Sequence, residues 1–227
     1  MKKQAHLKGI LYVVATPIGN LRDITLRALE VLKQSDGIIC EGFRSASTLL
    51  KKLEIKDKKL TLLDEHNEKT QSDQIVSMLF GGQQLALISD CGTPAFQDPG
   101  SHLIARCHEL GIRVISIPGP SSLMTALALS PLPIKEFYFA GFLPQKKPDR
   151  LRKMMSLKKL QLPIILMDTP YRLKKLLCEV SEHFGSNTKV ALALDLTLPE
   201  EEFFFDKIGD IIKRVQDRKG EFILIVY

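Results

Sequence analysis

The chain of 227 residues contains no tryptophan, only four cysteines and few aromatic side chains, which make up 7% of the sequence. Cys40, Cys91, Cys107 and Cys178 lie far apart and include no Cys-x-x-Cys pair, so neither a zinc site nor a disulfide framework is indicated. We therefore expect reduced, mostly buried cysteines and no bound metal.

The sequence also lacks an apolar stretch of about 18 residues, an internal repeat and a low-complexity tract. Its start, Met1-Lys-Lys-Gln, leads directly to an apolar segment and has no secretory leader pattern. With 44% hydrophobic and 26% charged residues, the composition is typical of a globular protein with room for two domains. We expect a cytoplasmic protein that does not enter a membrane.

The most informative segment is Leu85-Ala-Leu-Ile-Ser-Asp90-Cys-Gly-Thr-Pro, an apolar run that stops at an aspartate and a Gly/Pro-rich loop. Such a run predicts a parallel strand buried on both faces, with Asp90 at its carboxyl end. Ligands of open α/β sheets bind outside these strand ends. Gly92 and Gly100 permit close backbone approach to a ligand. The alternative is that Asp90 or Asp98 only caps a helix.

Two further segments have the same strand, loop and helix pattern. Residues 10–15 lead into Thr16-Pro-Ile-Gly-Asn-Leu-Arg-Asp23, and residues 114–117 lead into Pro118-Gly-Pro-Ser-Ser122. Neither contains G-x-G-x-x-G, so a dinucleotide-binding fold has no support. Ser121 or Ser122 is expected to cap the following helix or to contact a ligand.

The alternation of apolar runs and helical patterns predicts an α/β protein with two lobes and a cofactor cleft between them. Residues 1–117 form a parallel α/β lobe, with strands near 10–15, 36–41, 59–63, 85–89 and 113–117. Residues 118–227 form an α/β lobe with a mixed sheet: a helix, a strand at 136–141, a basic loop, a strand at 163–168, a helix through Phe184, a strand at 189–195, a helix and a strand at 221–227. Pro118 to Pro120 is the expected hinge, and the cleft is the default ligand site.

The three loop motifs, in this order and spacing, resemble the tetrapyrrole (corrin/porphyrin) methylase superfamily. Within it, the chain is similar to the bacterial 16S ribosomal RNA cytidine 2′-O-methyltransferases or to a shorter paralogous branch. Agreement extends to His66-Asn67-Glu68, Phe137 to Pro144, Arg150, Thr169-Pro-Tyr-Arg172 and Lys219 to Val226. The chain has Glu41-Gly42-Phe43-Arg44 where the family carries Glu-Asp-Thr-Arg, and it ends at Tyr227 where full-length members continue into a helical extension.

The resemblance implies a homodimeric, S-adenosylmethionine-dependent methyltransferase that needs no metal and acts on 16S rRNA of the small ribosomal subunit. It implies cofactor contacts, many through backbone groups, by Pro17, Ile18, Gly19, Asp90, Cys91, Gly92, Thr93, Phe96, Ser121, Ser122 and Leu194. Transfer to a 2′-hydroxyl is helped by a group that accepts its proton, and Asp or Glu at a strand end is suited to this. The catalytic candidates are Asp90, Glu41, Arg44 and Asp98, with Glu68 and His66 as further possibilities; Asp90 alternatively only orients the cofactor.

The formal charge of +6 fits a polyanionic partner, because neutralising phosphates releases counterions. The densest basic segment is Gln145 to Lys153, where RNA contacts are expected from Lys146, Lys147, Arg150 and Arg152; a second cluster spans Lys51 to Lys59. Each cluster is alternatively a solvated surface. Two other functions stay open: methylation of a small acidic substrate such as a tetrapyrrole, and a non-catalytic cofactor-binding paralogue, suggested by the altered Glu41 to Arg44 segment.

Overall fold

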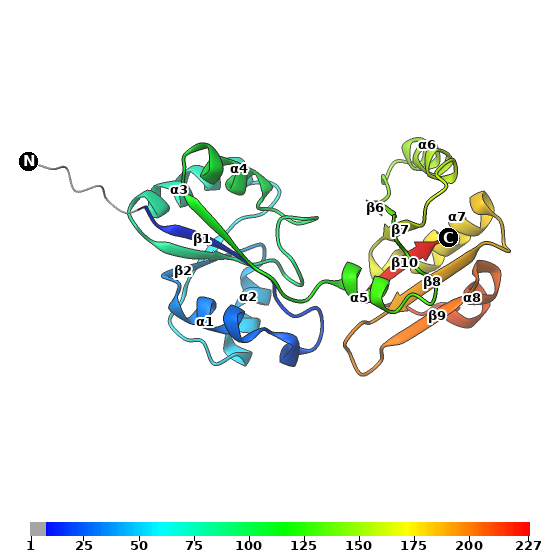
Figure 1. Cartoon of the computed structure of the whole chain (residues 1–227), viewed down its shortest axis with the longest axis horizontal. Helices are drawn as coiled ribbons and strands as arrows, with labels where there is room; N and C mark the ends of the chain where they lie inside the picture. The colour runs from blue at the N-terminus through cyan, green and yellow to red at the C-terminus, as the bar shows by residue number, and fades with distance from the viewer. Residues whose placement is uncertain (1–7) are drawn as a thin grey trace, which may run out of the picture. The chain divides into compact units, whose positions relative to one another are not determined.

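The computed structural model describes residues 8–227, and the chain divides after Ser121 into two compact units (Figure 1). The first unit contains β1 to β5 and the second β6 to β10. The expectation that no secretory leader is present concerns residues 1–7, which lie outside the described part of the chain.

The first unit is the predicted parallel α/β fold. Its five strands pair in the order β3-β2-β4-β1-β5, and every pairing is parallel. Their bounds are Ile10–Val14 for β1, Gly37–Cys40 for β2, Lys59–Leu62 for β3, Gln84–Leu87 for β4 and Arg113–Ile117 for β5. All five strands lie where the sequence predicted them, because buried parallel strands are apolar runs bounded by turn residues.

Helices cover both faces of this sheet, as Figure 1 shows. These helices are α1 (Leu26–Gln34), α2 (Phe43–Lys52), α3 (Glu68–Phe80) and α4 (Ser101–Glu109). The side chains of the β4 segment point alternately to the two faces of the sheet and so contribute to two separate cores. Leu85 and Leu87 pack with α3 and α4, whereas Ala86 and Ile88 pack with α1 and α2. Side chains alternate between the faces of a strand, so one apolar run supplies both cores.

The second unit has the predicted mixed sheet. Its strand order is β6-β7-β10-β8-β9; β6 and β7 are parallel, and the remaining pairings are antiparallel. The strands are β6 (Tyr138–Phe142), β7 (Ile164–Met167), β8 (Lys189–Leu194), β9 (Glu202–Lys207) and β10 (Phe222–Val226). The helices are α5 (Ser122–Ala128), α6 (Lys147–Lys158), α7 (Leu173–Phe184) and α8 (Ile208–Val215). Helices α6, α7 and α8 share one core with the sheet.

Two elements of this unit differ from the prediction. The basic segment is not a loop: from Lys147 onward it forms α6, because Arg150, Met154 and Leu157 recur at helical spacing and are buried. Strand β9 was not predicted at all. It pairs antiparallel with β8 through the hairpin at 195–201, and none of its residues is fully buried.

The cysteines are unbonded, but the expectation that most are buried was wrong. Cys40 and Cys107 are buried, whereas Cys91 and Cys178 are exposed. Burial, and for Cys40 also the nearby Asp90 charge, raises the pKa of each buried thiol to about 11. Both buried thiols are therefore protonated and unreactive at neutral pH.

Glu68, one of the further candidates for a base, has a structural role in the first unit. Its carboxylate accepts hydrogen bonds from the backbone N–H groups of Gly100 (2.8 Å) and His102 (2.9 Å). Helix α4 begins at Ser101 after a glycine that has no capping side chain of its own. Glu68 on α3 therefore caps α4 from the neighbouring helix.

We expect Glu68→Ala to lower the free energy of unfolding by about 1 kcal/mol, the usual cost of a lost cap. Lys69→Ala is the matched control, because Lys69 is the exposed neighbour in the same turn, and it should change stability by less than about 0.5 kcal/mol. Urea denaturation measures both values. Equal stabilities for the two variants would show that the cap contributes nothing.

Candidate active site at the carboxyl edge of the parallel sheet

The loops after β1, β4 and β5 meet at one edge of the first sheet. These three strands are neighbours and run parallel, so their carboxyl ends lie together. Thr16 and Gly92 exchange backbone hydrogen bonds of 2.8 and 3.1 Å, which join the first two loops. The Thr93 hydroxyl donates to the Pro120 carbonyl at 3.4 Å and ties in the third loop. The structure thus brings all three sequence motifs together.

Glycine is required where these loops touch. Gly92 has φ +76°, and a Cβ there would lie 3.3 Å from Ile18 Cγ2 and 3.9 Å from the Pro120 carbonyl oxygen. A Cβ at Gly119 would lie 3.1 Å from the Ala15 Cβ. The loops therefore present backbone N–H and C=O groups at close range, as a cradle for a ligand that is bound by main-chain contacts would need.

A cavity of about 600 Å³ opens beside these loops within the first unit. It is lined by Pro17, Ile18, Gly19, Leu21, Gly42, Arg44, Ser45, Thr48, Leu49, Lys52, Asp90 and Cys91. Six of these residues were predicted for the site: Pro17, Ile18, Gly19, Arg44, Asp90 and Cys91. The other residues that α2 contributes, Ser45, Thr48, Leu49 and Lys52, were not predicted. The sequence signal that could have found them is the spacing of four between Arg44, Thr48 and Lys52, which places them on one face of a helix.

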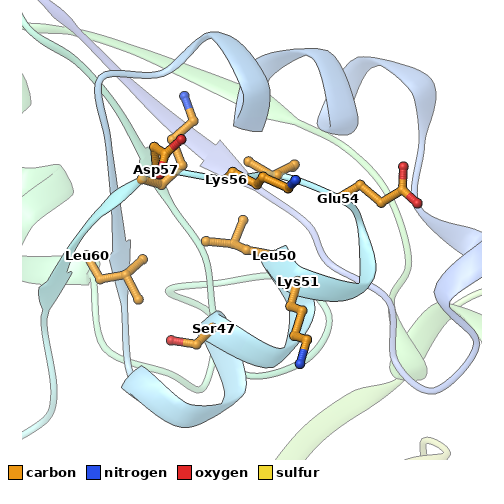
Figure 2. Close-up of a pocket in the computed structure, with 9 residues that line it drawn as sticks. Ser47, Leu50, Lys51, Glu54, Lys56, Asp57 and Leu60 are labelled. Carbon is orange, nitrogen blue, oxygen red and sulfur yellow. The ribbon is translucent and has the colours of Figure 1, made fainter.

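A second cavity, of about 760 Å³, lies beside another face of α2 and contains no predicted site residue. It is lined by Ser47, Leu50 and Lys51 of α2 together with Lys56, Asp57 and Leu60, all of which Figure 2 labels. Lys58, which also lines it, donates to the Lys33 and Ser35 carbonyls at 2.6 and 2.5 Å. That lysine therefore holds the end of α1.

Asp90 is exposed at the end of β4, and its carboxylate accepts a hydrogen bond from the Ser45 hydroxyl. Gly42 makes room for this contact: a Cβ there would lie 2.8 Å from Ser45 Oγ and 3.1 Å from Asp90 Oδ1. Glycine at the position where the similar family carries aspartate thus leaves Asp90 held by a neutral partner. The altered segment retains an ordered polar site.

Glu41 and Asp98 lie within electrostatic reach of Asp90 and of one another. The pKa of Glu41 is raised to about 7. Burial is the largest cause, followed by the negative charges of Asp98 and Asp90 and then by those of Glu65 and Asp64. Burial also raises the pKa of Asp98, a hydrogen bond with Ser89 opposes this rise, and the Asp90 charge adds to it. A carboxyl group that titrates near neutral pH is suited to accept a proton during catalysis.

The remaining predicted residues of the site differ in exposure. Phe96 is exposed in the loop after β4, and Ser121 and Ser122 are half-buried at the start of α5. Leu194 is fully buried in the core of the second unit, so only its main chain can face a ligand. His66 lies exposed in a turn where its backbone N–H donates to Asp64 at 2.9 Å.

Arg150 corrects the predicted RNA surface. Its side chain is 5% exposed, and its guanidinium binds Asp168 at 3.0 Å and Glu179 at 2.7 Å. The Leu143 and Pro144 carbonyls lie at 3.4 and 3.5 Å from the same group. Buried charges need partners of this kind, and a guanidinium so engaged does not reach RNA phosphates. Lys146, Lys147 and Arg152 are exposed, as an RNA surface requires.

The sequence matches the family of tetrapyrrole (corrin/porphyrin) methylases over residues 10–212. The chain belongs to this family. The predicted class of enzyme, an S-adenosylmethionine-dependent methyltransferase, is therefore confirmed. Among residues 8–227, no group of three or more His, Cys, Asp or Glu side chains is arranged to hold a metal, and no helix is long and apolar enough to cross a membrane.

The chain is similar to bacterial proteins named ribosomal RNA small subunit methyltransferase I. The protein of Vibrio cholerae is 38% identical over 96% of this chain and 77% of its own length. The protein of Mesorhizobium japonicum is 41% identical over 97% and 76%, and that of Escherichia coli O157:H7 is 39% identical over 96% and 78%. A solved structure, uroporphyrin-III-C-methyltransferase from Thermus thermophilus, matches 96% of this chain and 94% of its own with a TM-score of 0.66. At 18% identity, this last likeness concerns the fold alone.

Proposed function

We propose that this protein transfers a methyl group from S-adenosylmethionine to the 2′-hydroxyl of a cytidine in 16S rRNA of the small ribosomal subunit. The observation that carries this proposal is an identity of 38 to 41%, over nearly the whole chain, with proteins named for methylation of this RNA. An enzyme of the ribosome would act in the cytoplasm.

The loops of the first unit fit the cofactor. The joined loops carry, at or beside them, the predicted contacts Pro17 to Gly19, Asp90 to Thr93, Phe96 and Ser121. When bound, S-adenosylmethionine supplies a methyl group made electrophilic by its sulfonium. The residues of this chain then have to bind and orient the reactants. Ser122 and Leu194 belong to the second unit and remain predicted contacts.

The proton of the attacking hydroxyl needs an acceptor, and Glu41 is the group we assign. With a pKa of about 7, a sizeable fraction of Glu41 is unprotonated at neutral pH and can take the proton onto a carboxylate oxygen. Asp90, held by Ser45, orients the reacting groups. Asp98 keeps the Glu41 pKa high through its charge, and Arg44 supplies a positive charge at the cavity.

The function is tested by methyl transfer from labelled cofactor to small-subunit particles that lack the modification and to protein-free 16S rRNA. We expect transfer to the particle to be faster, because the shape of an assembled particle supplies specificity that base contacts do not. A 2′-O-methyl group blocks alkaline cleavage at its nucleotide, so the product is identified by its resistance. Absence of transfer to either RNA would reject the proposal.

Cofactor binding by the joined loops is tested with Gly92→Val. The new side chain would need φ +76° and would press on Ile18, so we expect calorimetry to detect at least a tenfold loss of S-adenosylmethionine affinity, or about 1.4 kcal/mol. Gly111→Val is the control, because Gly111 also has positive φ (+63°) but meets only the Lys8 ammonium at 3.6 Å. If both variants bind as the parent does, the cofactor is held elsewhere.

RNA contact by the start of α6 is tested by replacing Lys146, Lys147 and Arg152 with glutamine. Each lost phosphate contact lowers the salt dependence, so the slope of log affinity against log salt should fall by about 2 units in total. The control neutralises Lys207, Lys213 and Arg214, which changes net charge equally in the same unit. Equal slopes for the two triple variants would make the α6 residues an ordinary solvated surface.

We also propose that the protein is a homodimer. Tyr138 and Phe142 on the edge strand β6, with Leu151 and Met155 on α6, expose large apolar surfaces that a second copy would cover. Light scattering of the purified protein measures the mass, and a monomer would reject this part of the proposal.

A further inference from the structure

Helix α2 has two exposed faces that open onto different cavities. Arg44, Thr48 and Lys52 recur every fourth residue and line the cavity that contains Asp90. Ser47 and Lys51 lie on another face and line the second cavity, as Figure 2 shows. The neighbouring lysines Lys51 and Lys52 thus line different cavities, although the sequence presents them as one basic cluster.

The residues that line the active-site cavity carry more positive than negative charges. Arg44 and Lys52 are its cations, and Asp90 is its one carboxylate among the lining residues. Within residues 8–227, neither cation forms an ion pair, whereas Arg150, Arg152 and Arg218 all do. Two exposed positive charges are therefore available to an anionic ligand in the cavity that also contains Asp90.

Arg44 is also poorly placed for helix stability. It lies in the first turn of α2, which has no acidic residue and no side-chain cap, and a cation at this end opposes the helix dipole. Lys52 lies in the last turn, where the dipole favours a cation, so stability alone accounts for Lys52 but not for Arg44. A shared ligand accounts for both.

We infer that Arg44 and Lys52 form a phosphate-binding track that leads the RNA strand to Asp90. The inference rests on the proposed function, in that RNA is the methyl acceptor. Eight residues of helix separate the two cations by about 12 Å, which suits contacts to more than one phosphate of an extended strand. Thr48 lies between them, and its hydroxyl donates to the Arg44 carbonyl at 2.7 Å, so it acts as a neutral spacer.

The test compares Lys52→Gln with Lys51→Gln, two adjacent substitutions that remove the same charge from the same turn. We measure the affinity for protein-free 16S rRNA as a function of salt. Lys52→Gln should weaken binding and lower the slope of log affinity against log salt by about 0.7, the value for one single-strand phosphate contact. Lys51→Gln should leave the slope unchanged, and Lys52→Arg, which keeps the charge, should retain the parent slope.

Two results would contradict the proposed phosphate-binding track. Equal slopes for Lys51→Gln and Lys52→Gln would show that only net charge matters. A loss of S-adenosylmethionine affinity in Lys52→Gln, measured by calorimetry, would assign the cations to the cofactor instead of RNA. Failure of the proposed function has a different signature, because the parent protein would then transfer no methyl group to particles or to 16S rRNA whatever its RNA affinity.

Discussion

Replacing Glu41 with glutamine is expected to lower kcat for methyl transfer by about 10² to 10⁴-fold, the usual contribution of a positioned general base. Glutamine keeps the size of the side chain but cannot accept the proton of the attacking hydroxyl. In the parent, activity should rise with pH through about 7, because burial and the carboxylates of Asp98 and Asp90 hold the pKa of Glu41 there. Initial rates between pH 5.5 and 8.5 should show this acidic limb in the parent and not in Glu41→Gln.

Glu65→Gln is the matched control for this experiment. Glu65 is exposed and contributes to the raised pKa of Glu41, so its removal should move the acidic limb to slightly lower pH without reducing the maximal rate. If Glu41→Gln retains both the rate and the acidic limb, Glu41 is not the base, and Asp90 and Asp98 become the groups to test.

The same pKa has a consequence for stability. Because the folded state raises the pKa of Glu41 above the unfolded value near 4.5, it binds this proton more tightly than the unfolded chain does. The stabilisation is complete below about pH 4.5 and is lost as pH rises through about 7. Glu41→Gln should therefore have a higher Tm than the parent at pH 8, and this advantage should disappear near pH 4.5.

Replacing Arg150 with alanine is expected to lower the free energy of unfolding of the second unit by about 3 to 5 kcal/mol. The substitution leaves Asp168, whose side chain is 2% exposed, without its closest cationic partner, and it removes the ion pair with Glu179. Arg172 lies 3.6 Å from the other Asp168 oxygen and offsets only part of this loss, since it is itself partly exposed. Urea denaturation followed by circular dichroism measures the effect.

Arg152→Ala provides the comparison, because Arg152 lies two residues away on the same helix and forms only an exposed pair with Asp149. Such a pair contributes at most about 1 kcal/mol. Similar stabilities for Arg150→Ala and Arg152→Ala would mean that the buried pair does not hold α6 against the sheet.

Gly42 occupies a position where the family carries aspartate, and the structure shows how this difference is accommodated. Gly42 offers no Cβ, and the space is taken by the Ser45 hydroxyl and the Asp90 carboxylate, which meet there. The non-catalytic interpretation rested on this altered segment alone. Glu41 is retained beside it, with a pKa that burial and the neighbouring carboxylates raise to about 7, so the base that we propose does not belong to the lost pair.

Local sequence patterns were enough to locate every strand of the first unit and the loops that join at its edge. Buried strands of a parallel sheet are continuous apolar runs, and their ends are marked by glycine, proline and aspartate, so the information lies within a few neighbouring residues. The family resemblance implied that the three motifs share one cofactor site, and the structure brings them together because β4, β1 and β5 are adjacent parallel strands that end at one edge. The family, the cofactor and the class of reaction followed from the same short segments.

Contacts between distant residues decided the rest. Arg150 belongs to a run of basic residues, and only the approach of Asp168 and Glu179 turned it inward. The cavities that Lys51 and Lys52 line depend on how α2 is rotated against the sheet, and the pKa of Glu41 depends on burial and on carboxylates up to 57 positions away. Burial and electrostatic interaction energies depend on distances in space, and the order of residues along the chain specifies these distances only after folding.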